Sequence, residues 1–401
     1  MTSEGGGYPM SRIDYKNILT FRFVFEALNR DLKLLFFSNL TGAFGEGLYF
    51  YILPLHMEDL GASSVEVGIL FSALGLATAF TLLLGGFLAD RYDRKKVIIL
   101  GWLIWLPTPI ILSLAENWSQ LLSGVIPYGF WIGQPASSAY IATAAEKDKM
   151  TLAFTTISAS WSLGYIFSPA LGGYLSTLIG MKCVFWLSFV FYALCTFGLF
   201  FISGQHATKK SSQTSTGISF RKKKIVIWAI FFAAIMFVVT LARPFVTLFL
   251  EDELHFDRFH IGVLGSVTFL GSAILAVTLG RLGDKWRKAG AVSVSIMLVC
   301  ASLTGLLFFS NFFALIFPFF LMGATYMFWS LMGAVVGSMA PEASRGRWMS
   351  VSQTTCMLAT ILAPYLGGML YHASPHNPFI VAVAATPLLS ILALSKLLKE
   401  E

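Results

Sequence analysis

Two charged residues stand inside long apolar runs, where a charge is costly. Glu46 lies in the glycine-bordered stretch 42–47, and Arg243 lies near the end of the apolar run 225–250. A single charge at the centre of a membrane helix costs about 2.5–3.5 kcal/mol on insertion scales, so such residues usually face a cavity and serve a function. A carboxyl group keeps its proton in a dry site and releases it beside a cation. Glu46 is therefore a candidate proton-exchanging group, and Arg243 is a candidate anchor for a carboxylate or phosphate.

Aromatic residues are expected at a similar depth, where they could contact a ligand. The sequence Tyr128-Gly-Phe130-Trp131 returns as Tyr326-Met-Phe328-Trp329 in the second half of the chain. Such rings suit an amphipathic or aromatic ligand and attract cations through their faces. Glu46 favours a cationic ligand and Arg243 an anionic one, and the sequence leaves this choice open. The candidate ligand-contacting residues are Tyr49, Trp131, Gln134, Arg243, Tyr326 and Trp329.

A second charged pattern occurs twice, each time after an apolar run. The first copy is Gly86-Phe-Leu-Ala-Asp90-Arg91-Tyr-Asp-Arg94-Lys95-Lys96, and the second is Gly280-Arg-Leu-Gly-Asp284-Lys285. A glycine at a helix end lets a neighbouring helix approach closely. A carboxylate at the membrane boundary can accept hydrogen bonds from a helix N-terminus and complement its dipole. Arg94 follows Asp90 by four residues, so the two are expected on one helical face.

The elements that must position these residues are long apolar helices. Hydrophobic residues make up 56% of the chain and charged residues 12%, whereas a soluble domain carries about 25% charged residues. The sequence therefore predicts an all-α, polytopic membrane protein, since a helix crosses a bilayer with about 20 apolar residues. About twelve spans are predicted, near 34–57, 65–88, 97–115, 119–142, 152–178, 182–203, 225–250, 260–282, 290–309, 312–336, 349–371 and 377–397.

The distribution of charge predicts the orientation of these spans. Nearly all lysines and arginines fall in the terminal tails and in the loops after even-numbered spans, whereas Glu58, Asp59 and Glu251 lie on the opposite side. Because basic loops face the cytoplasm, both termini are expected there, in a multi-pass protein of the cell membrane. The net charge of +7 is then explained by topology and by contact with anionic lipid head groups, not by nucleic-acid binding.

The chain reads as two related halves. Besides the charged pattern, Ser168-Pro169-Ala-Leu-Gly172-Gly173 is matched by Ala363-Pro364-Tyr-Leu-Gly367-Gly368. Six spans in each half give both halves the same orientation, which is a parallel repeat. The predicted divisions are a cytoplasmic tail at 1–33, a six-helix bundle at 34–203, a basic cytoplasmic linker at 204–224, and a second six-helix bundle with a short cytoplasmic tail at 225–401.

On these motifs the chain resembles the major facilitator superfamily over nearly its whole length. The segment 86–96 is similar to the family's signature loop, with Asp93 where a glycine is common, and Ser168-Pro169-Ala-Leu-Gly172-Gly173 resembles its helix-5 antiporter motif, with Ser168 where a glycine usually stands. The resemblance implies about twelve helices in two pseudo-symmetric bundles around a central cavity. It also implies a cytoplasmic latch formed by Gly86, Asp90, Arg91, Arg94 and Glu146, with Gly280, Asp284 and Lys285 as the counterpart.

The resemblance implies a secondary transporter that works by alternating access. Proton-coupled export of small amphipathic or drug-like compounds is the leading hypothesis, with protons, lipids and a small-molecule substrate as partners and the monomer as the working unit. Uptake of an organic anion or polar metabolite held by Arg243 is one alternative, and a non-transporting sensor or scaffold is another. No nucleotide-binding P-loop is present, and the scattered histidines and cysteines predict no metal site, no cofactor and no enzyme.

Overall fold

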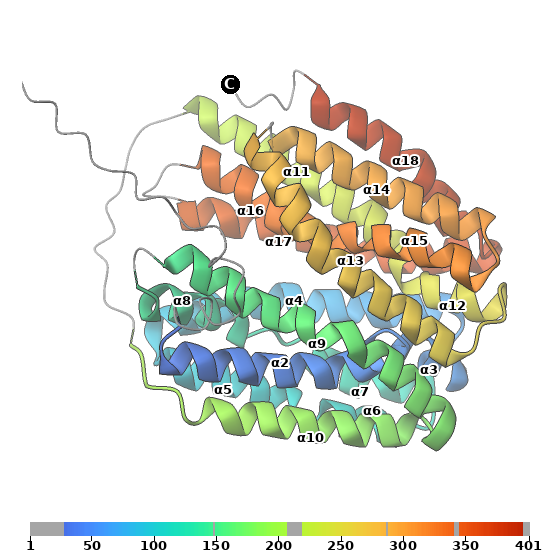
Figure 1. Cartoon of the computed structure of the whole chain (residues 1–401), viewed down its shortest axis with the longest axis horizontal. Coiled ribbons are helices and arrows are strands. Elements are labelled where there is room, and N and C mark those ends of the chain that lie inside the picture. Colours follow the sequence, from blue (N-terminus) through green and yellow to red (C-terminus); the bar gives the residue numbers. More distant parts are fainter. Residues whose placement is uncertain (1–27, 147–148, 207–218, 286–287, 341–344, 396–401) are drawn as a thin grey trace, which may run out of the picture.

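The computed structural model describes residues 28–146, 149–206, 219–285, 288–340 and 345–395. Within these residues the protein consists of helices in two bundles that lie side by side (Figure 1). The predicted tail up to residue 27, most of the linker and residues 396–401 lie outside the described part of the chain. The first bundle contains α2 (Arg30–Phe50), α3 (Leu53–Asp59), α4 (Ser64–Arg91), α5 (Arg94–Trp105), α6 (Thr108–Leu114), α7 (Trp118–Tyr128), α8 (Gly133–Ala144), α9 (Met150–Ile179) and α10 (Met181–Leu199).

The second bundle repeats this order of spans. Its elements are α11 (Ser219–Ala242), η1 (Arg243–Phe245), α12 (Val246–Asp252), α13 (Arg258–Lys285), α14 (Lys288–Phe308), α15 (Phe312–Met322), η2 (Gly323–Tyr326), α16 (Met327–Met339), α17 (Arg345–Ala373) and α18 (Asn377–Leu394). Nine stretches of the described chain are long and apolar enough to cross a membrane. The other three predicted spans correspond to α2 with α3, to α7 with α8, and to α9.

The protein is a multi-pass membrane protein, and its surface agrees with that environment. Phe308 and Phe313 have 80% and 77% of their surface exposed, and many other large apolar side chains are exposed on the outer faces of the helices. A soluble protein would rarely expose apolar surface on this scale, whereas lipid tails solvate it. The helical backbone meanwhile satisfies its own hydrogen bonds, as a bilayer requires.

Proline and glycine interrupt the spans that carry the candidate site. Pro244 lies in the short 3₁₀ helix η1 next to Arg243, and Gly323 begins the 3₁₀ helix η2 that ends at Tyr326. Pro127 precedes the break between α7 and α8, where Trp131 lies. A proline removes a backbone donor and clashes with the preceding turn, so helices bend or break there. Because of these breaks, the candidate side chains point in directions that they would not have in continuous helices.

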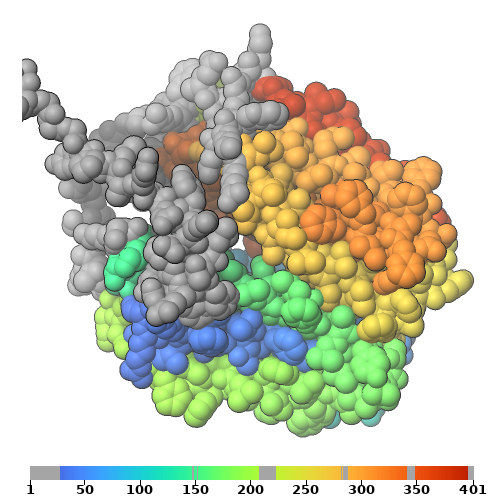
Figure 2. Space-filling view, in the orientation of Figure 1, coloured from blue at the N-terminus to red at the C-terminus, as the bar shows by residue number. Residues whose placement is uncertain are grey.

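The two ends of the molecule differ in how the bundles meet. We define the basic end as the end with Arg30, Arg94 and Leu394, and the acidic end as the end with Asp59 and Asp252. The largest contacts between bundles are made by α4 with α17 and by α9 with α13. Close backbone approaches within these pairs, including Gly368 on Ser64 and Gly173 on Arg258, lie toward the acidic end. In Figure 2 the green and yellow surfaces of the two bundles abut on that side.

Candidate functional site

Glu46 is enclosed in the first bundle, on α2. Its side chain is 2% exposed, and the hydroxyl of Tyr128 donates a short hydrogen bond to Oε1. Its other carboxylate oxygen, Oε2, is buried and makes no hydrogen bond of standard geometry with a described residue, although Tyr165 also lies close enough to interact with the carboxyl group. The carboxyl group therefore has one anchored oxygen and one oxygen available for a proton or a ligand donor.

Arg243 lies between the bundles and is exposed although it falls within a membrane span. Its guanidinium carbon lies 5.5 Å from the centre of the Phe50 ring in the first bundle and 5.4 Å from the Tyr326 ring in the second. Both distances are typical of a cation–π interaction. No ion pair within 4.0 Å joins Arg243 to Glu46 in the described structure, although its positive charge acts on Glu46 electrostatically. Its charge thus remains available to an entering ligand.

A row of aromatic rings connects the two bundles near these charges. Trp161 stacks on Tyr165 with ring centres 6.4 Å apart, and Tyr165 stacks on Phe269 of the second bundle at 4.5 Å. Phe269 in turn contacts Tyr326 at 5.0 Å, and Tyr326 lies beneath Arg243. Stacked and tilted aromatic pairs at these distances are favourable contacts. The row leads from the first bundle to the exposed guanidinium.

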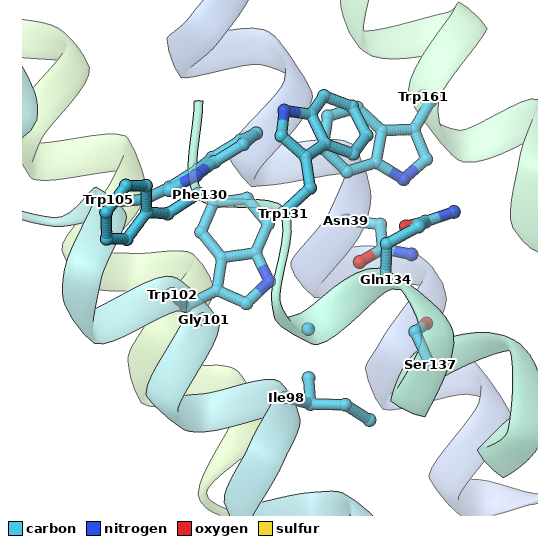
Figure 3. Close-up of a pocket in the computed structure, with 11 residues that line it drawn as sticks. Asn39, Ile98, Gly101, Trp102, Trp105, Phe130, Trp131, Gln134, Ser137 and Trp161 are labelled. Atoms are coloured by element: carbon cyan, nitrogen blue, oxygen red, sulfur yellow. The ribbon is translucent and has the colours of Figure 1, made fainter. Parts of the chain in front are cut away.

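A small cavity of about 40 Å³ opens at the start of this row, inside the first bundle (Figure 3). Trp131 and Gln134, both predicted ligand contacts, line it together with Asn39 and Ser137. Three further tryptophans complete the wall, namely Trp102, Trp105 and Trp161. Its lining combines aromatic rings with a few polar groups, as ligand pockets do, but its volume is well below the range of about 300–1,000 Å³ for pockets that hold a drug-sized molecule.

The other predicted contacts are distributed differently. Tyr49 is fully buried in the core of the first bundle, and its hydroxyl is paired with that of Tyr192 at 2.9 Å. Tyr326 is half-buried against Arg243, and Trp329 is half-buried one turn further on in α16. The structure thus groups Trp131 with Gln134 and Arg243 with Tyr326, whereas it places Tyr49 behind Glu46 and not on the cavity wall.

The signature segment does not form the expected helical pair. The helix α4 ends at Arg91 and α5 begins at Arg94, so Asp90 and Arg94 lie on different helices and the prediction of one shared face is wrong. Arg94 instead donates hydrogen bonds to Thr143, Gln205 and the carbonyl oxygen of Ala139, at 2.6–3.1 Å. Asp90 is exposed and makes no ion pair with another described residue.

Asp93, the departure from the usual signature, has a clear local role. It is the N-cap of α5, and its Oδ1 accepts a hydrogen bond from the backbone N–H of Lys95 at 2.8 Å. An N-cap aspartate satisfies a free backbone donor and stabilises the start of a helix by about 1 kcal/mol. Where the family commonly has a flexible glycine, Asp93 therefore fixes the start of α5 through this hydrogen bond.

The remaining latch residues lie apart in this conformation. Glu146 is exposed and bonds Lys149 at 2.6 Å. A Cβ added at Gly86 or Gly280 would meet no described atom of another segment within 4 Å, so neither glycine makes the expected close helix contact. The neighbouring Gly85 makes such a contact, against Ile132. Arg91 is exposed, with its guanidinium 5.9 Å from the Phe87 ring. Asp284 and Lys285 end α13, and their side chains fall outside the described part of the structure.

The paired glycine motifs have matching roles in the two bundles. A Cβ at Gly172 would fall 1.7 Å from the Leu48 oxygen, and one at Gly367 would fall 2.1 Å from the Leu241 oxygen, so both pack helices within a bundle. Gly173 and Gly368 are equally tight against Arg258 and Ser64, across the bundle interface. The carbonyl groups of Pro169 and Pro364 also lie at that interface, where Gly262 and Gly68 approach them.

An ion pair ties the bundles together at the acidic end. Arg258 donates two hydrogen bonds to Asp59, at 2.6 and 2.7 Å, and its Nε lies 3.7 Å from Glu251. Partial burial would raise the pKa of Asp59, but its interactions with His56 and Arg258 hold the pKa below its ordinary value. For Glu58, partial burial and then the negative charges of Asp252, Glu251 and Asp59 raise the pKa to about 8.

Sequence reasoning missed several residues of the cavity. Trp102 and Trp105 lie on α5, Trp161 lies on α9, and none of these helices carries a charge near the cavity to draw attention. Asn39 precedes Glu46 by seven residues, which places both on one face of α2 two turns apart. This spacing is the sequence signal that could have identified Asn39. Among the described residues, no group of three or more His, Cys, Asp or Glu side chains is arranged to hold a metal ion.

Comparison with known proteins identifies relatives of the whole chain. The sequence matches the Major Facilitator Superfamily over residues 35–250 and 229–401. It is 28% identical to "Multidrug resistance protein MdtG" of Proteus mirabilis, over 82% of this chain and 86% of the relative. It is 24% identical to "Multidrug resistance protein 2" of Bacillus subtilis, over 88% of this chain and 92% of the relative.

Solved structures share the fold. The nucleoside transporter NupG superposes with a TM-score of 0.75 at 15% identity, covering 93% of this chain and 100% of the other. A bacterial homologue of the lysosomal transporter Spinster, in an inward-facing and unoccupied conformation, has a TM-score of 0.70 at 14% identity, covering 93% and 96%. At such identities the likeness establishes the arrangement of helices, and the substrate must be argued from the site.

Proposed function

Because the chain belongs to the Major Facilitator Superfamily, we propose that it is a secondary active exporter of small amphipathic, drug-like compounds that works by alternating access. The relatives named as multidrug resistance proteins support this direction and substrate class. The aromatic cavity and the absence of a nucleotide-binding P-loop from the sequence support a gradient-driven transporter of apolar molecules. The protein is proposed to act as a monomer, surrounded by lipid, with no cofactor and no enzymatic step.

The proposed orientation places the basic end in the cytoplasm. The loops there carry most of the lysines and arginines, and such loops face the cytoplasm in membrane proteins. The protein is accordingly proposed to reside in the cell membrane with both termini cytoplasmic. With close contacts gathered at the acidic end and open space around Gly86 and Gly280 at the basic end, this conformation is proposed to be the one that receives substrate from the cytoplasm.

The single observation that carries the coupling mechanism is the environment of Glu46. A carboxyl group that is 2% exposed, with one oxygen bonded to Tyr128 and the other without a hydrogen bond of standard geometry but near Tyr165, can bind a proton in one conformation and lose it in the other. Arg243 lies in the path between the bundles, where its approach would favour release of that proton. Trp131, Gln134, Tyr326 and Trp329 are the proposed substrate contacts, and Tyr49 is proposed to support the proton site from behind.

The substitution Glu46→Gln tests this proposal. It keeps the volume and the hydrogen bond with Tyr128 but cannot exchange a proton. In proteoliposomes, the variant should lose pH-driven accumulation of a fluorescent amphipathic substrate while it still exchanges substrate between equal concentrations. Glu116→Gln, a matched change at an exposed loop position, should behave like the unsubstituted protein. Undiminished pH-driven accumulation by Glu46→Gln would remove Glu46 from the coupling mechanism.

A further inference from the structure

Tyr165 lies where the proposed proton site meets the contact between the bundles. It belongs to α9, and its ring packs against α2 next to Glu46, where a Cβ added at Gly47 would fall 2.9 Å from its Cδ1 atom. Its side chain also lies close enough to the Glu46 carboxyl group to interact with it. A phenol hydroxyl can donate a hydrogen bond to a carboxylate. One side chain of α9 therefore reaches the group that is proposed to exchange the proton.

The same tyrosine ring contacts the second bundle. It stacks on Phe269 of α13, with ring centres 4.5 Å apart and an interplanar angle of 18°. Phe269 is 5% exposed, and it contacts Tyr326, whose ring lies 5.4 Å from the guanidinium carbon of Arg243. A stacked ring pair is a favourable contact, and it restricts how either ring can turn. The direction of the Tyr165 hydroxyl is thus set partly by a residue of the other bundle.

The contact between α9 and α13 belongs to the part of the protein that moves in alternating access. The two helices lie side by side and make one of the largest contacts between the bundles (Figure 1). Nearer the acidic end, the backbone N–H of Ala170 donates a hydrogen bond to Oγ of Ser266 at 3.1 Å, and the glycine contacts of that end continue the same interface. When the acidic end opens, α9 and α13 separate there, and the stack of Tyr165 on Phe269 is loosened.

This stack has a consequence for the carboxyl group. A hydrogen-bond donor beside a carboxyl group favours its charged form. While Phe269 holds the ring of Tyr165, the hydroxyl stays at Glu46 and favours loss of the proton. When the stack loosens, the ring can turn away, and the carboxyl group keeps its proton because burial disfavours its charge. The two conformations therefore differ in their free energy of proton binding, as coupling requires.

We propose that Tyr165 is a positioning residue that couples the protonation of Glu46 to the movement of the bundles, through its stack on Phe269. The inference rests on the proposed role of Glu46 and names the contact that makes this role depend on conformation. In the present conformation, which is proposed to face the cytoplasm, the stack is intact and Glu46 releases its proton to that side. With the acidic end open, Glu46 binds a proton from outside. Protons thus move inward as substrate moves outward.

Infrared difference spectroscopy of the full-length protein in lipid nanodiscs measures this link. The carbonyl band of protonated Glu46 is identified by its absence from Glu46→Gln, and its loss is followed as the pH rises. Tyr165→Phe keeps the ring but removes the hydroxyl, so the midpoint of the titration should rise by about one pH unit. Phe269→Leu keeps the hydroxyl but removes the stack, so the midpoint should rise as well. Tyr174→Phe on α9, whose ring contacts Phe259 of the second bundle at 5.9 Å, should leave the midpoint unchanged.

The double variant separates positioning from a general effect on packing. Because both changes act through one hydroxyl, Phe269→Leu should add little to the effect of Tyr165→Phe. An unchanged midpoint in Tyr165→Phe, or fully additive effects of the two changes, would overturn the proposal. If Glu46→Gln lost no band, Glu46 would not exchange a proton, and the proposed coupling function would fail together with the link. A Glu46 band that titrates at the same pH in every variant would refute the link and leave the role of Glu46 intact.

Discussion

At the scale of single residues, the two intramembrane charges have unequal surroundings. Glu46 is sealed in one bundle and bonded to a tyrosine, whereas Arg243 is exposed between two aromatic rings that belong to different bundles. A sealed carboxyl group suits a small ion such as a proton. An exposed guanidinium suits a larger partner and changes its surroundings whenever the bundles move. The difference supports the proposal that proton binding and ligand contact belong to different residues.

Arg243→Ala tests the second of these roles. Loss of a charge-assisted hydrogen bond should weaken an anionic amphipathic ligand by at least about tenfold, and a cationic ligand should bind equally well or more tightly. Arg243→Lys keeps the charge but loses the flat stacking surface, so its affinity for the anionic ligand should lie between that of the unsubstituted protein and that of Arg243→Ala. Equilibrium binding to purified protein is the measurement. An equal loss for both ligand classes would show that Arg243 acts through folding and not through contact with ligand.

At the scale of helices, the two glycines of each motif make different contacts, and the pattern is the same in both bundles. The first glycine of each pair packs its helix within the bundle, and the second packs it against the start of a helix in the other bundle. Close helix approach through glycine is a general means of association in membranes. Because the second glycines lie toward the acidic end, they belong to the contact that must separate when that end opens.

Gly173→Ala should therefore affect the conformational equilibrium more than folding. Its Cβ would fall 2.0 Å from the Arg258 oxygen, and overpacking of this kind costs about 1–3 kcal/mol. Spin labels at Glu116 and Ser310, exposed positions at the acidic end of each bundle, should report a population with longer distances. Gly280→Ala, where a Cβ meets open space, serves as the control. An unchanged distance distribution in Gly173→Ala would contradict this role.

Much of this architecture could be predicted from the sequence, because hydropathy and repetition are local signals. The spans, the repeat, Glu46 and Arg243 all follow from residue type and spacing. The cavity could not be predicted, because Trp102 on α5 and Trp161 on α9 become neighbours only through tertiary packing of the first bundle. Arg94 was misplaced for a related reason, since the turn at Tyr92 and Asp93 separates it from Asp90 on another helix. Side-chain partners depend on tertiary packing that a one-dimensional pattern does not encode.

At the scale of the whole molecule, the acidic end combines an ion pair between the bundles with a cluster of carboxyl groups. The Asp59–Arg258 pair joins segments 199 residues apart, and the negative charges of Asp252, Glu251 and Asp59 act on the nearby Glu58. At the other end, the signature residues Asp90 and Arg94, whose side chains are described, form no ion pair with a described residue of the other bundle. A ligand or proton changes the balance between two such conformations only through a difference in free energy between them. The acidic end is therefore a place where pH can act directly.

Raising the pH should loosen the acidic end through Glu58. Its pKa is about 8 while the end is closed, so the closed form favours the protonated carboxyl. An open end would solvate Glu58 and return its pKa toward the ordinary value, so deprotonation favours opening, and the closed end weakens as the pH rises toward and through 8. The pKa of Asp59 is lowered, so Asp59 stays ionised over this pH range and adds no pH dependence to the closed end.

The thiol introduced by Ser64→Cys reports this change, because Ser64 is buried against Gly368 at the bundle interface. With Cys183 replaced by serine, its alkylation rate between pH 6 and 9, divided by that of a free thiol, should rise with pH. The rise should persist in Glu116→Gln and vanish in Glu58→Gln, which is neutral at every pH. The same rise in Glu58→Gln would show that another group governs the acidic end. A corrected alkylation rate that does not change with pH in the protein that retains Glu58 would show that ionisation of Glu58 does not affect the contact between α4 and α17.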